Sequence, residues 1–502
     1  MTALTPGALP AIADALPVPT YDRTRIVPGI VHIGVGGFHR SHQAMYVDRL
    51  LRHGRGDEYG ICGVGVLAGD RRMKEVLEAQ GGLYTLVAKH PDGTIEAQVI
   101  GSIVRYLFAP DDPEEVVETL ARPTTRIVSL TITEGGYAVD PVTGGFDPSG
   151  PQVRADLQPG AIPTTAFGLV TEALARRRER SVPPFTVMSC DNIQGNGDVA
   201  RRAFTAFARL RDVELGRWVE QAVAFPNSMV DRITPVTGDA DRSLVAERFG
   251  IADAWPVVCE PWAQWVLEDH FSHGRPPLED VGVQLVADVV PYELMKLRLL
   301  NAGHQALCYL GSLSGHRYVH EVCQDPLFVR FLRRYMDEEA TPTLAPVPGV
   351  DLPAYKQTLI DRFANAHVRD TLARLCADSS DRIPTWLVPV IRHQLAHEGP
   401  IGSAALVVAS WARYAEGRDE QGQAIVVVDP LAEQTMAAAR RQDEDPTAFI
   451  GQRDLFGDLA DQPRFVDTYV RLLQHLKAHG ARATLAMHLG DDARGPSRGA
   501  AR

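Results

Sequence analysis

The sequence predicts an α/β domain with a mostly parallel sheet, followed by a mainly α-helical domain. Three observations predict this class. Short apolar runs alternate with helical patterns over residues 1–288, a glycine-rich turn joins the first such run to the first helical pattern, and helical periodicity dominates residues 289–502. Strands that alternate with helices are typical of a parallel sheet.

The predicted strands are short, rich in β-branched residues and followed by polar or glycine-rich loops. They cover residues 29–35, 59–67, 126–132 and 185–190. Their continuous apolar character indicates strands that are buried on both faces. Helical patterns are predicted between them, over residues 38–52, 112–121 and 165–178.

Helices are predicted through most of the second domain. They cover residues 291–312, 325–338, 355–377 and 464–478. Pro291 suits a first helical turn, where its missing N–H leaves no bond unmade. A single strand-like run is predicted at 424–428, and the polar tail 490–502 is predicted to be disordered.

Composition excludes several classes of function. The net charge of −12 disfavours binding to nucleic acid. The six cysteines show neither C-x-x-C nor zinc-finger spacing, which favours reduced thiols in a reducing compartment. No apolar stretch is long enough to span a membrane, and the N-terminus lacks the pattern of a signal peptide, so we expect a cytoplasmic protein. The acidic, two-domain chain favours a monomer.

A glycine turn, G-V-G-G-F-H-R at 34–40, follows the first predicted strand. Gly34 would permit the tight turn, and Gly36 would let a pyrophosphate approach the backbone at the start of the helix. We therefore predict that Gly34, Gly36, Gly37 and Phe38 bind a dinucleotide, in a Rossmann-type domain. A ligand-free turn is the alternative. His39 replaces the usual third glycine, which predicts a looser contact between strand and helix.

Asp70 follows the second predicted strand. An acidic residue there would bond the adenosine ribose 2′-hydroxyl and repel a 2′-phosphate, which favours NAD over NADP. Arg71 and Arg72 are next and offer charge for a phosphate, so NADP stays open as the weaker alternative. Asp70 could instead cap the helix predicted over 71–79.

Polar side chains interrupt the apolar helix M-K-L-R-L-L-N-A-G-H at 295–304. At ~100° a residue, Asn301 and His304 lie about 140° and 80° from Lys296, within one half of the helix. An amine, an amide and an imidazole are costly to bury unless they bind something. A polyol or keto-sugar offers the hydroxyls and carbonyl that such groups bind.

Hydride transfer suits these residues. Burial lowers the pKa of a lysine, so Lys296 is a candidate general base for a secondary alcohol. Asn301 and His304 are candidates to stabilise the developing alkoxide. Glu293, one turn earlier, is either a proton relay from Lys296 to solvent or a surface ion pair. No metal is required. His39 and His42 are the nearest approach to a zinc ligand pair, and they lie in the nucleotide turn.

Five motifs together resemble the polyol-specific long-chain dehydrogenases. They are I-V-H-I-G-V-G-G-F-H-R-S-H-Q, T-I-T-E-G-G-Y, S-C-D-N-I-Q-G-N-G, F-P-N-S-M-V-D-R-I-T-P and K-L-R-L-L-N-A-G-H. The resemblance runs from about Tyr21 to beyond residue 480, and is strongest to members that interconvert D-mannitol and D-fructose with NAD.

The resemblance implies a Rossmann-type domain and a helical domain with the active site between them. It implies a zinc-independent reaction with Lys296 as the base, and places Asn301 and His304 around the reacting oxygen. It also implies four substrate contacts: Asn192, Asp231, Arg374 and Arg382. Gly69, before Asp70, departs from the second acidic residue of some relatives, which leaves the strictness of NAD use open.

Other substrates and functions stay open. Within the family these are sugar-acid reduction (fructuronate or tagaturonate) and oxidation of arabinitol or glucitol. Arg374 and Arg382 would suit a carboxylate. Outside the enzymes, the chain could be a non-catalytic NAD-binding sensor.

Overall fold

The computed structural model describes residues 1–140 and 144–490, without the side chain of Glu134. The tail predicted to be disordered therefore lies outside the described residues, except for its first residue. The chain divides into two compact units, the first ending at Val290 and the second beginning at Pro291. Each unit is described by itself.

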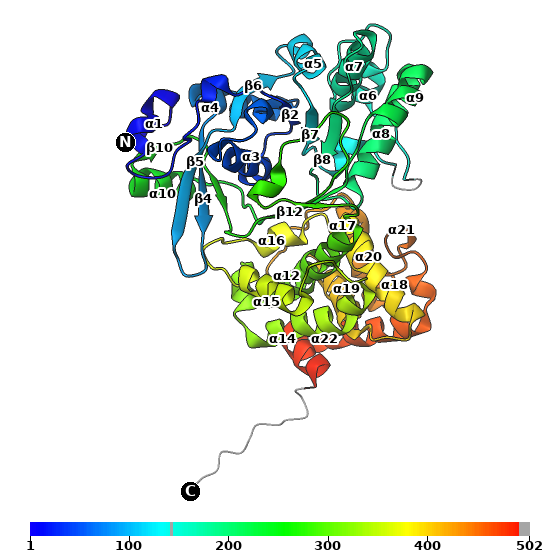
Figure 1. Cartoon of the computed structure of the whole chain (residues 1–502). Helices are drawn as coiled ribbons and strands as arrows, with labels where there is room; N and C mark the ends of the chain where they lie inside the picture. Colours follow the sequence, from blue (N-terminus) through cyan, green and yellow to red (C-terminus); the bar gives the residue numbers. More distant parts are fainter. Residues whose placement is uncertain (141–143, 491–502) are drawn as a thin grey trace. The chain divides into compact units, whose positions relative to one another are not determined.

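The first unit is built on a five-stranded parallel sheet (Figure 1). Its order is β6 (Ile103–Phe108), β3 (Ile61–Gly65), β2 (Ile30–Ile33), β7 (Ile127–Leu130) and β8 (Thr186–Ser189). The four predicted strands are confirmed as β2, β3, β7 and β8. Their alternate residues serve two separate cores: Val31 and Ile33 pack on one face of the sheet, and Ile30 on the other.

Helices cover one face of this sheet and a mixed layer covers the other. Side chains of α5 (Pro113–Ala121), α7 (Ala166–Glu179) and α8 (Asn196–Arg211) form the core that holds Val31. The opposite core holds α3 (Gln43–Arg52) and α4 (Arg71–Ala79), together with strands outside the main sheet. A parallel sheet buried on both faces is the doubly wound arrangement that the sequence predicts.

Two three-stranded sheets of this unit were absent from the sequence prediction. One has the order β11 (Val257–Cys259), β4 (Tyr84–Lys89), β5 (Ile95–Ile100), and the other β13 (Gln284–Val286), β12 (Gln264–Glu268), β9 (Ser228–Asp231). β4 and β5 form an antiparallel hairpin that is drawn in lighter blue in Figure 1. β1 (Thr2–Ala3) pairs with β10 (Ile251–Ala252).

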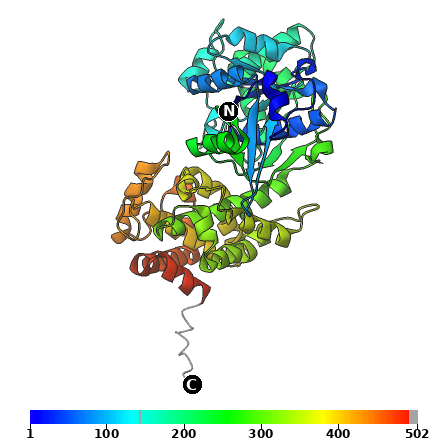
Figure 2. The ribbon, with the colours of Figure 1, turned by 90° about the vertical axis from the view of Figure 1, so that its left-hand side faces the viewer.

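The second unit contains helices and isolated bridges in its described residues (Figure 2). α12 (Ala302–Leu313) is almost wholly buried, and it contacts α16 (Leu372–Cys376) and α19 (Gly402–Tyr414). α19 also packs along α22 (Pro463–Leu489). α12, which carries His304 and directly follows Lys296 and Asn301, is therefore a core helix of its unit.

Three details of the predicted elements are wrong. The helix at 38–52 is two helices, α2 (Gly37–Ser41) and α3, because His42 between them adopts φ −116° and ψ −90°. The helix at 355–377 is α15 (Leu352–Phe363) and α16, which begins where the Thr371 side chain accepts the N–H of Arg374. The run at 424–428 has no strand beside it and makes one bridge, from Ala424 to Arg418.

Candidate active site

The glycine turn after β2 brings two segments of backbone into close contact. Gly34 has φ +95°, and a Cβ there would lie 2.1 Å from the carbonyl oxygen of Thr131 at the end of β7. Only glycine meets both requirements. At Gly36 a Cβ would have no heavy atom nearer than 3.9 Å, so its backbone faces open space. This is the geometry that a pyrophosphate needs to approach the turn.

A cavity of about 360 Å³ opens beside this turn. Gly34, Gly36 and Asp70 line it, together with Leu67 and Thr131. Gly37 and Phe38, which were also predicted to bind the cofactor, are not among its lining residues, and Phe38 stacks on His42. The cavity lies beyond the carboxyl ends of β2, β3 and β7, where parallel α/β sheets bind nucleotides. Its backbone and its acidic residue fit a dinucleotide.

Asp70 closes the loop after β3 and does not cap α4 with its side chain. Its Oδ2 accepts the N–H groups of Val66 and Leu67, both at 2.9 Å. The neighbouring arginines have other partners. Arg71 forms an ion pair with Asp111 at 2.8 Å, and Arg72 lies over the Trp255 ring at 4.8 Å. Neither arginine lines the cavity, so this edge of the site favours a free ribose hydroxyl over a 2′-phosphate.

Asp191 holds the far wall of the cavity, and the sequence reasoning missed it. Its carboxylate accepts the N–H groups of Ile132 and Thr133, at 3.1 and 2.8 Å, and the Tyr137 hydroxyl at 2.7 Å. Thr133 has φ 62° and ψ 172°, a conformation that residues other than glycine rarely adopt. The signal was available, because Asp191 lies inside the S-C-D-N motif beside the predicted contact Asn192.

The histidines of the turn pack as neutral rings. His39, at the position of the usual third glycine, stacks on His32 of β2 with ring centroids 3.5 Å apart. The prediction of a loose contact between strand and helix is therefore wrong. Burial lowers the pKa of His32 to about 3 and that of His39 well below its usual range. The Nε2–H of His42 donates to the carbonyl oxygen of Gln264 at 2.9 Å. Within residues 1–140 and 144–490, no three His, Cys, Asp or Glu side chains form a metal-ligand group.

The helix that carries Lys296 is not a regular α-helix. α11 (Val290–Met295) is followed by a π-helical segment, η7 (Lys296–Asn301), and then by α12. The N–H of Ala302 donates to the carbonyl of Leu297, five residues earlier. A turn with this wider bonding holds more residues than an α-turn, so each residue rotates by less than 100°. Asn301 therefore lies closer in angle to Lys296 than the 140° that the sequence predicts.

The three predicted catalytic residues are all buried. Lys296 and Asn301 begin and end the π-helical segment, with 7% and 5% of their surface exposed, and His304 follows in α12 with its ring 4.3 Å from that of Phe363. In the part of the chain that the structure describes, Oδ1 of Asn301 has no hydrogen-bond partner. Glu293, one turn before Lys296, is 4% exposed, which excludes a surface ion pair.

Arg374 and Arg382 lie beside this helix. Gln305 of α12 and Arg382 of α17 (Ser379–Trp386) both donate to the carbonyl of Leu375, so α12, α16 and α17 meet there. Each arginine has an acidic neighbour. Arg374 donates to both carboxylate oxygens of Asp370, at 2.6 and 2.5 Å, and Arg382 lies 3.5 Å from Asp378.

The remaining predicted substrate contacts belong to the first unit. Asn192 is exposed in the turn after β8. Asp231 is the last residue of β9 and is buried, and its Oδ2 accepts the indole N–H of Trp262 at 3.0 Å.

No helix in residues 1–140 or 144–490 combines the length and apolar character that crossing a bilayer requires.

A nucleotide-type cavity in a Rossmann unit, and a second unit with a buried lysine, amide and imidazole on one helix, define a two-domain dehydrogenase. Comparison with known proteins agrees. Residues 28–280 match the mannitol dehydrogenase Rossmann domain, and residues 288–477 match the mannitol dehydrogenase C-terminal domain. The chain belongs to the mannitol dehydrogenase family and is an oxidoreductase.

Individual relatives match over nearly the whole chain. Mannitol 2-dehydrogenase of Aspergillus fumigatus is 46% identical over 479 residues, which is 94% of this chain and 95% of the relative. The structure of Pseudomonas fluorescens mannitol 2-dehydrogenase, a ternary complex with NAD and D-mannitol, is 46% identical with a TM-score of 0.91, covering 97% and 100% of the two chains. A substrate-free D-sorbitol dehydrogenase is 37% identical with a TM-score of 0.87, covering 96% and 100%.

Proposed function

We propose that this chain is an NAD-dependent polyol dehydrogenase that interconverts D-mannitol and D-fructose without a metal ion. The observation that carries the proposal is the polar helix of the second unit, where Lys296 and Asn301 are buried at the two ends of a π-helical segment. Among the residues that the structure describes, none bonds to Oδ1 of Asn301. A polyol hydroxyl would supply a partner for this oxygen. The relatives named for mannitol support the choice of substrate.

NAD would be held by the turn at Gly34 and Gly36 and by Asp70, and when bound it accepts hydride from the carbon that is oxidised. Lys296 Nζ takes the proton of the reacting hydroxyl. Burial disfavours a charged amine, which makes a neutral lysine available to act as base. Asn301 donates through its amide nitrogen to the oxygen as negative charge develops on it, and His304 assists.

Glu293 is proposed to pass the proton on from Lys296. It precedes Lys296 by three residues, so the two side chains lie on neighbouring turns of the helix, and both are buried. In the reverse direction, Lys296 returns the proton as hydride reaches the ketose carbonyl. Asn192 and Asp231 are proposed as contacts to substrate hydroxyls farther from the reacting carbon.

The pairing of the arginines favours a neutral substrate. A sugar acid requires a cation that is free to meet its carboxylate. Arg374 and Arg382 each have an aspartate beside them, Asp370 and Asp378, so the pair of arginines adds little net charge. D-Glucitol (sorbitol) is the second candidate substrate, since the D-sorbitol dehydrogenase is also similar over nearly the whole chain.

The test measures NADH oxidation with D-fructose and NAD reduction with D-mannitol, for the wild type and Lys296→Ala, with and without EDTA. We expect both activities in the wild type, no effect of EDTA, and a fall of at least about 10³-fold in kcat for the variant, because the base is lost. NADH binding, followed by fluorescence, should survive.

Lys356→Ala is the matched control, since Lys356 is also buried in the second unit but bonds to Asp337. It should keep its kcat. Full activity in Lys296→Ala would overturn the assignment of the base. A wild type that turns over neither D-fructose nor D-mannitol, but does turn over fructuronate or glucitol, would change the proposed substrate. NADH binding without any turnover would indicate a non-catalytic sensor. A cytoplasmic location and a monomeric state remain predictions.

A further inference from the structure

The π-helical segment leaves one carbonyl of the catalytic helix without its usual α-helical donor. In an α-helix the N–H of Ala302 would donate to Arg298, four residues earlier. Here it donates to Leu297 instead. Arg298 lies inside the segment, between Lys296 and Asn301. Isolated π-turns are rare and concentrate at functional sites, so we expect a group that stabilises this turn by bonding to the Arg298 carbonyl.

Tyr335 supplies that group. Its hydroxyl donates to the carbonyl oxygen of Arg298 at 3.1 Å, and its side chain is fully buried. Tyr335 opens a second π-helical segment, η8 (Tyr335–Ala340), in which the N–H of Thr341 likewise donates five residues back, to Met336. The two π-helical segments pack against each other.

The same neighbouring segment also holds the Arg298 side chain. Nη1 of Arg298 donates to the carbonyl of Thr343 at 2.5 Å. Residues 335–343 therefore contact Arg298 at both its main chain and its side chain. Arg298, which lies between Lys296 and Asn301 in the sequence, is therefore held by a segment that contains none of the proposed catalytic residues.

The angle between Lys296 and Asn301 depends on this turn. On an α-helix the two residues would lie about 140° apart, and the wider turn reduces that angle. If the turn relaxed to α-helix, the base and the amide would rotate away from each other. Small misplacements of catalytic groups cost large factors in rate, up to about 10²-fold for 1 Å.

We propose that Tyr335 is a positioning residue for the reaction, and that its hydroxyl, through the Arg298 carbonyl, holds the π-helical turn that sets Lys296 and Asn301 on one face. The inference rests on the proposed function of those two residues. The competing view is that Tyr335 only fills the core, in which case its hydroxyl would affect stability and leave turnover alone.

Tyr335→Phe removes the hydroxyl and keeps the ring. The matched control is Tyr469→Phe, since Tyr469 is equally buried in the same unit and donates to Gln442 at 2.7 Å, a residue outside the catalytic helix. For Tyr335→Phe we expect kcat with D-mannitol to fall at least about tenfold, while NADH affinity stays within about twofold. Tyr469→Phe should keep its kcat, although both variants lose one buried hydrogen bond.

Amide hydrogen exchange, measured without substrate, reports directly on how readily the hydrogen bonds of the π-helical turn open. Exchange at residues 297–303 should quicken in Tyr335→Phe and stay unchanged in Tyr469→Phe. Slower turnover together with quicker exchange supports the proposal. An unchanged kcat, an unchanged exchange pattern, or an equal loss of kcat in Tyr469→Phe would overturn it. A wild type without polyol activity would overturn the proposed function instead, and exchange would still report whether Tyr335 holds the turn.

Discussion

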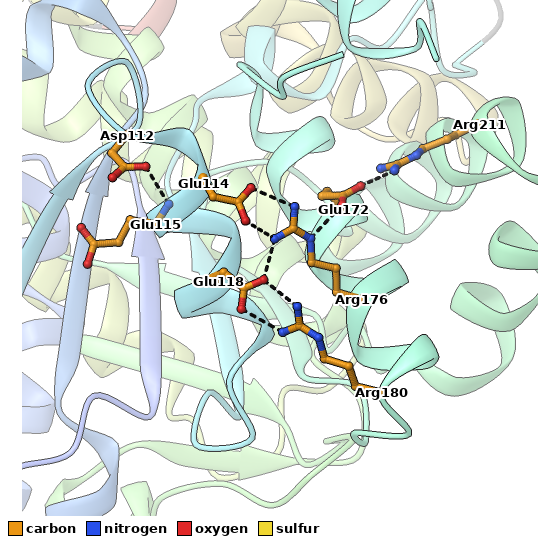
Figure 3. A network of polar contacts seen from close by, with 8 residues as sticks. All are labelled: Asp112, Glu114, Glu115, Glu118, Glu172, Arg176, Arg180 and Arg211. Atoms are coloured by element: carbon orange, nitrogen blue, oxygen red, sulfur yellow. Dashed lines mark hydrogen bonds and ion pairs between the residues drawn. The ribbon is translucent and has the colours of Figure 1, made fainter. Parts of the chain in front are cut away.

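Two polar regions of this chain are built in opposite ways. On the first unit, Arg176 of α7 reaches Glu114 and Glu118 of α5 and Glu172 of its own helix, and Figure 3 shows the dashed contacts joining these side chains. Arg180 and Arg211 extend the group, which we call the Arg176 cluster. On the second unit, Asn301 is buried with a carbonyl oxygen that meets no partner in the described residues.

The difference separates a structural polar group from one that awaits a ligand. In the Arg176 cluster every carboxylate faces a guanidinium, so nothing further has to bind. A buried amide oxygen without a partner costs free energy, roughly 1–3 kcal/mol, and persists where function requires it. Substitution should therefore act on activity at one region and on stability at the other.

Between these two regions, the largest expected effect comes from replacing the Asn301 amide. Asn301→Leu should lower kcat/KM for D-mannitol by about 10²–10³-fold, because a donor to the developing alkoxide is lost. The free energy of unfolding should stay level or rise, since an unpartnered buried oxygen is removed. Steady-state kinetics and urea unfolding measure the two quantities.

Asn196→Leu is the matched control for that substitution. Asn196 is also buried, but its amide donates to the carbonyls of Asp191 and Ser228, and its Oδ1 accepts the N–H of Ser228. This variant should lose about 2 kcal/mol or more of stability. If Asn301→Leu proved equally destabilising, the contrast between a satisfied and an unsatisfied amide would fail.

A buried carboxylate gives the next effect. Both oxygens of Glu339 accept N–H groups at the start of α19, from Ser403 at 2.6 Å and Ala404 at 2.8 Å, yet burial raises its pKa from 4.5 to about 7. The folded state thus holds its proton more tightly than the unfolded state. The stabilisation is complete below about pH 4.5 and is lost as the pH rises to about 7.

The change should reach about 3 kcal/mol. Urea unfolding at pH 5 and pH 8 should show the wild type losing stability across this range relative to Glu339→Gln, which cannot titrate. Parallel pH profiles for the two proteins would contradict the raised pKa. Such a result would mean that two backbone donors are sufficient to keep a buried carboxylate charged.

The smallest effect is expected at the Arg176 cluster. Arg176→Met keeps the apolar stem and removes the charge, and should lower the free energy of unfolding by about 1–2 kcal/mol, because three carboxylates lose a shared partner. The loss should shrink in high salt, since the cluster is partly exposed. A change of more than about twofold in kcat would show that the cluster is linked to the reaction.

Much of the fold could be predicted from local patterns in the sequence. The apolar runs of β2, β3, β7 and β8 identify the central sheet because strands buried on both faces need continuous apolar side chains. The smaller sheets escaped prediction. β5 is partly exposed, and β4, although buried, pairs on its other side with the distant segment β11. Such strands form because they pair with a particular neighbouring strand, and a local sequence pattern does not identify that partner.

The candidate site divides in the same way. The glycine turn could be predicted from the sequence, because only glycine fits beside Thr131, and helical periodicity predicted that Lys296, Asn301 and His304 share one helix. The π-helical turn and the contacts of Asp191 and Tyr335 depend on packing between distant segments, which the sequence pattern does not contain. A π-turn replaces one backbone hydrogen bond by another of similar strength, so the choice between them depends on side chains distant in sequence, here a tyrosine hydroxyl 37 residues from the carbonyl that it holds.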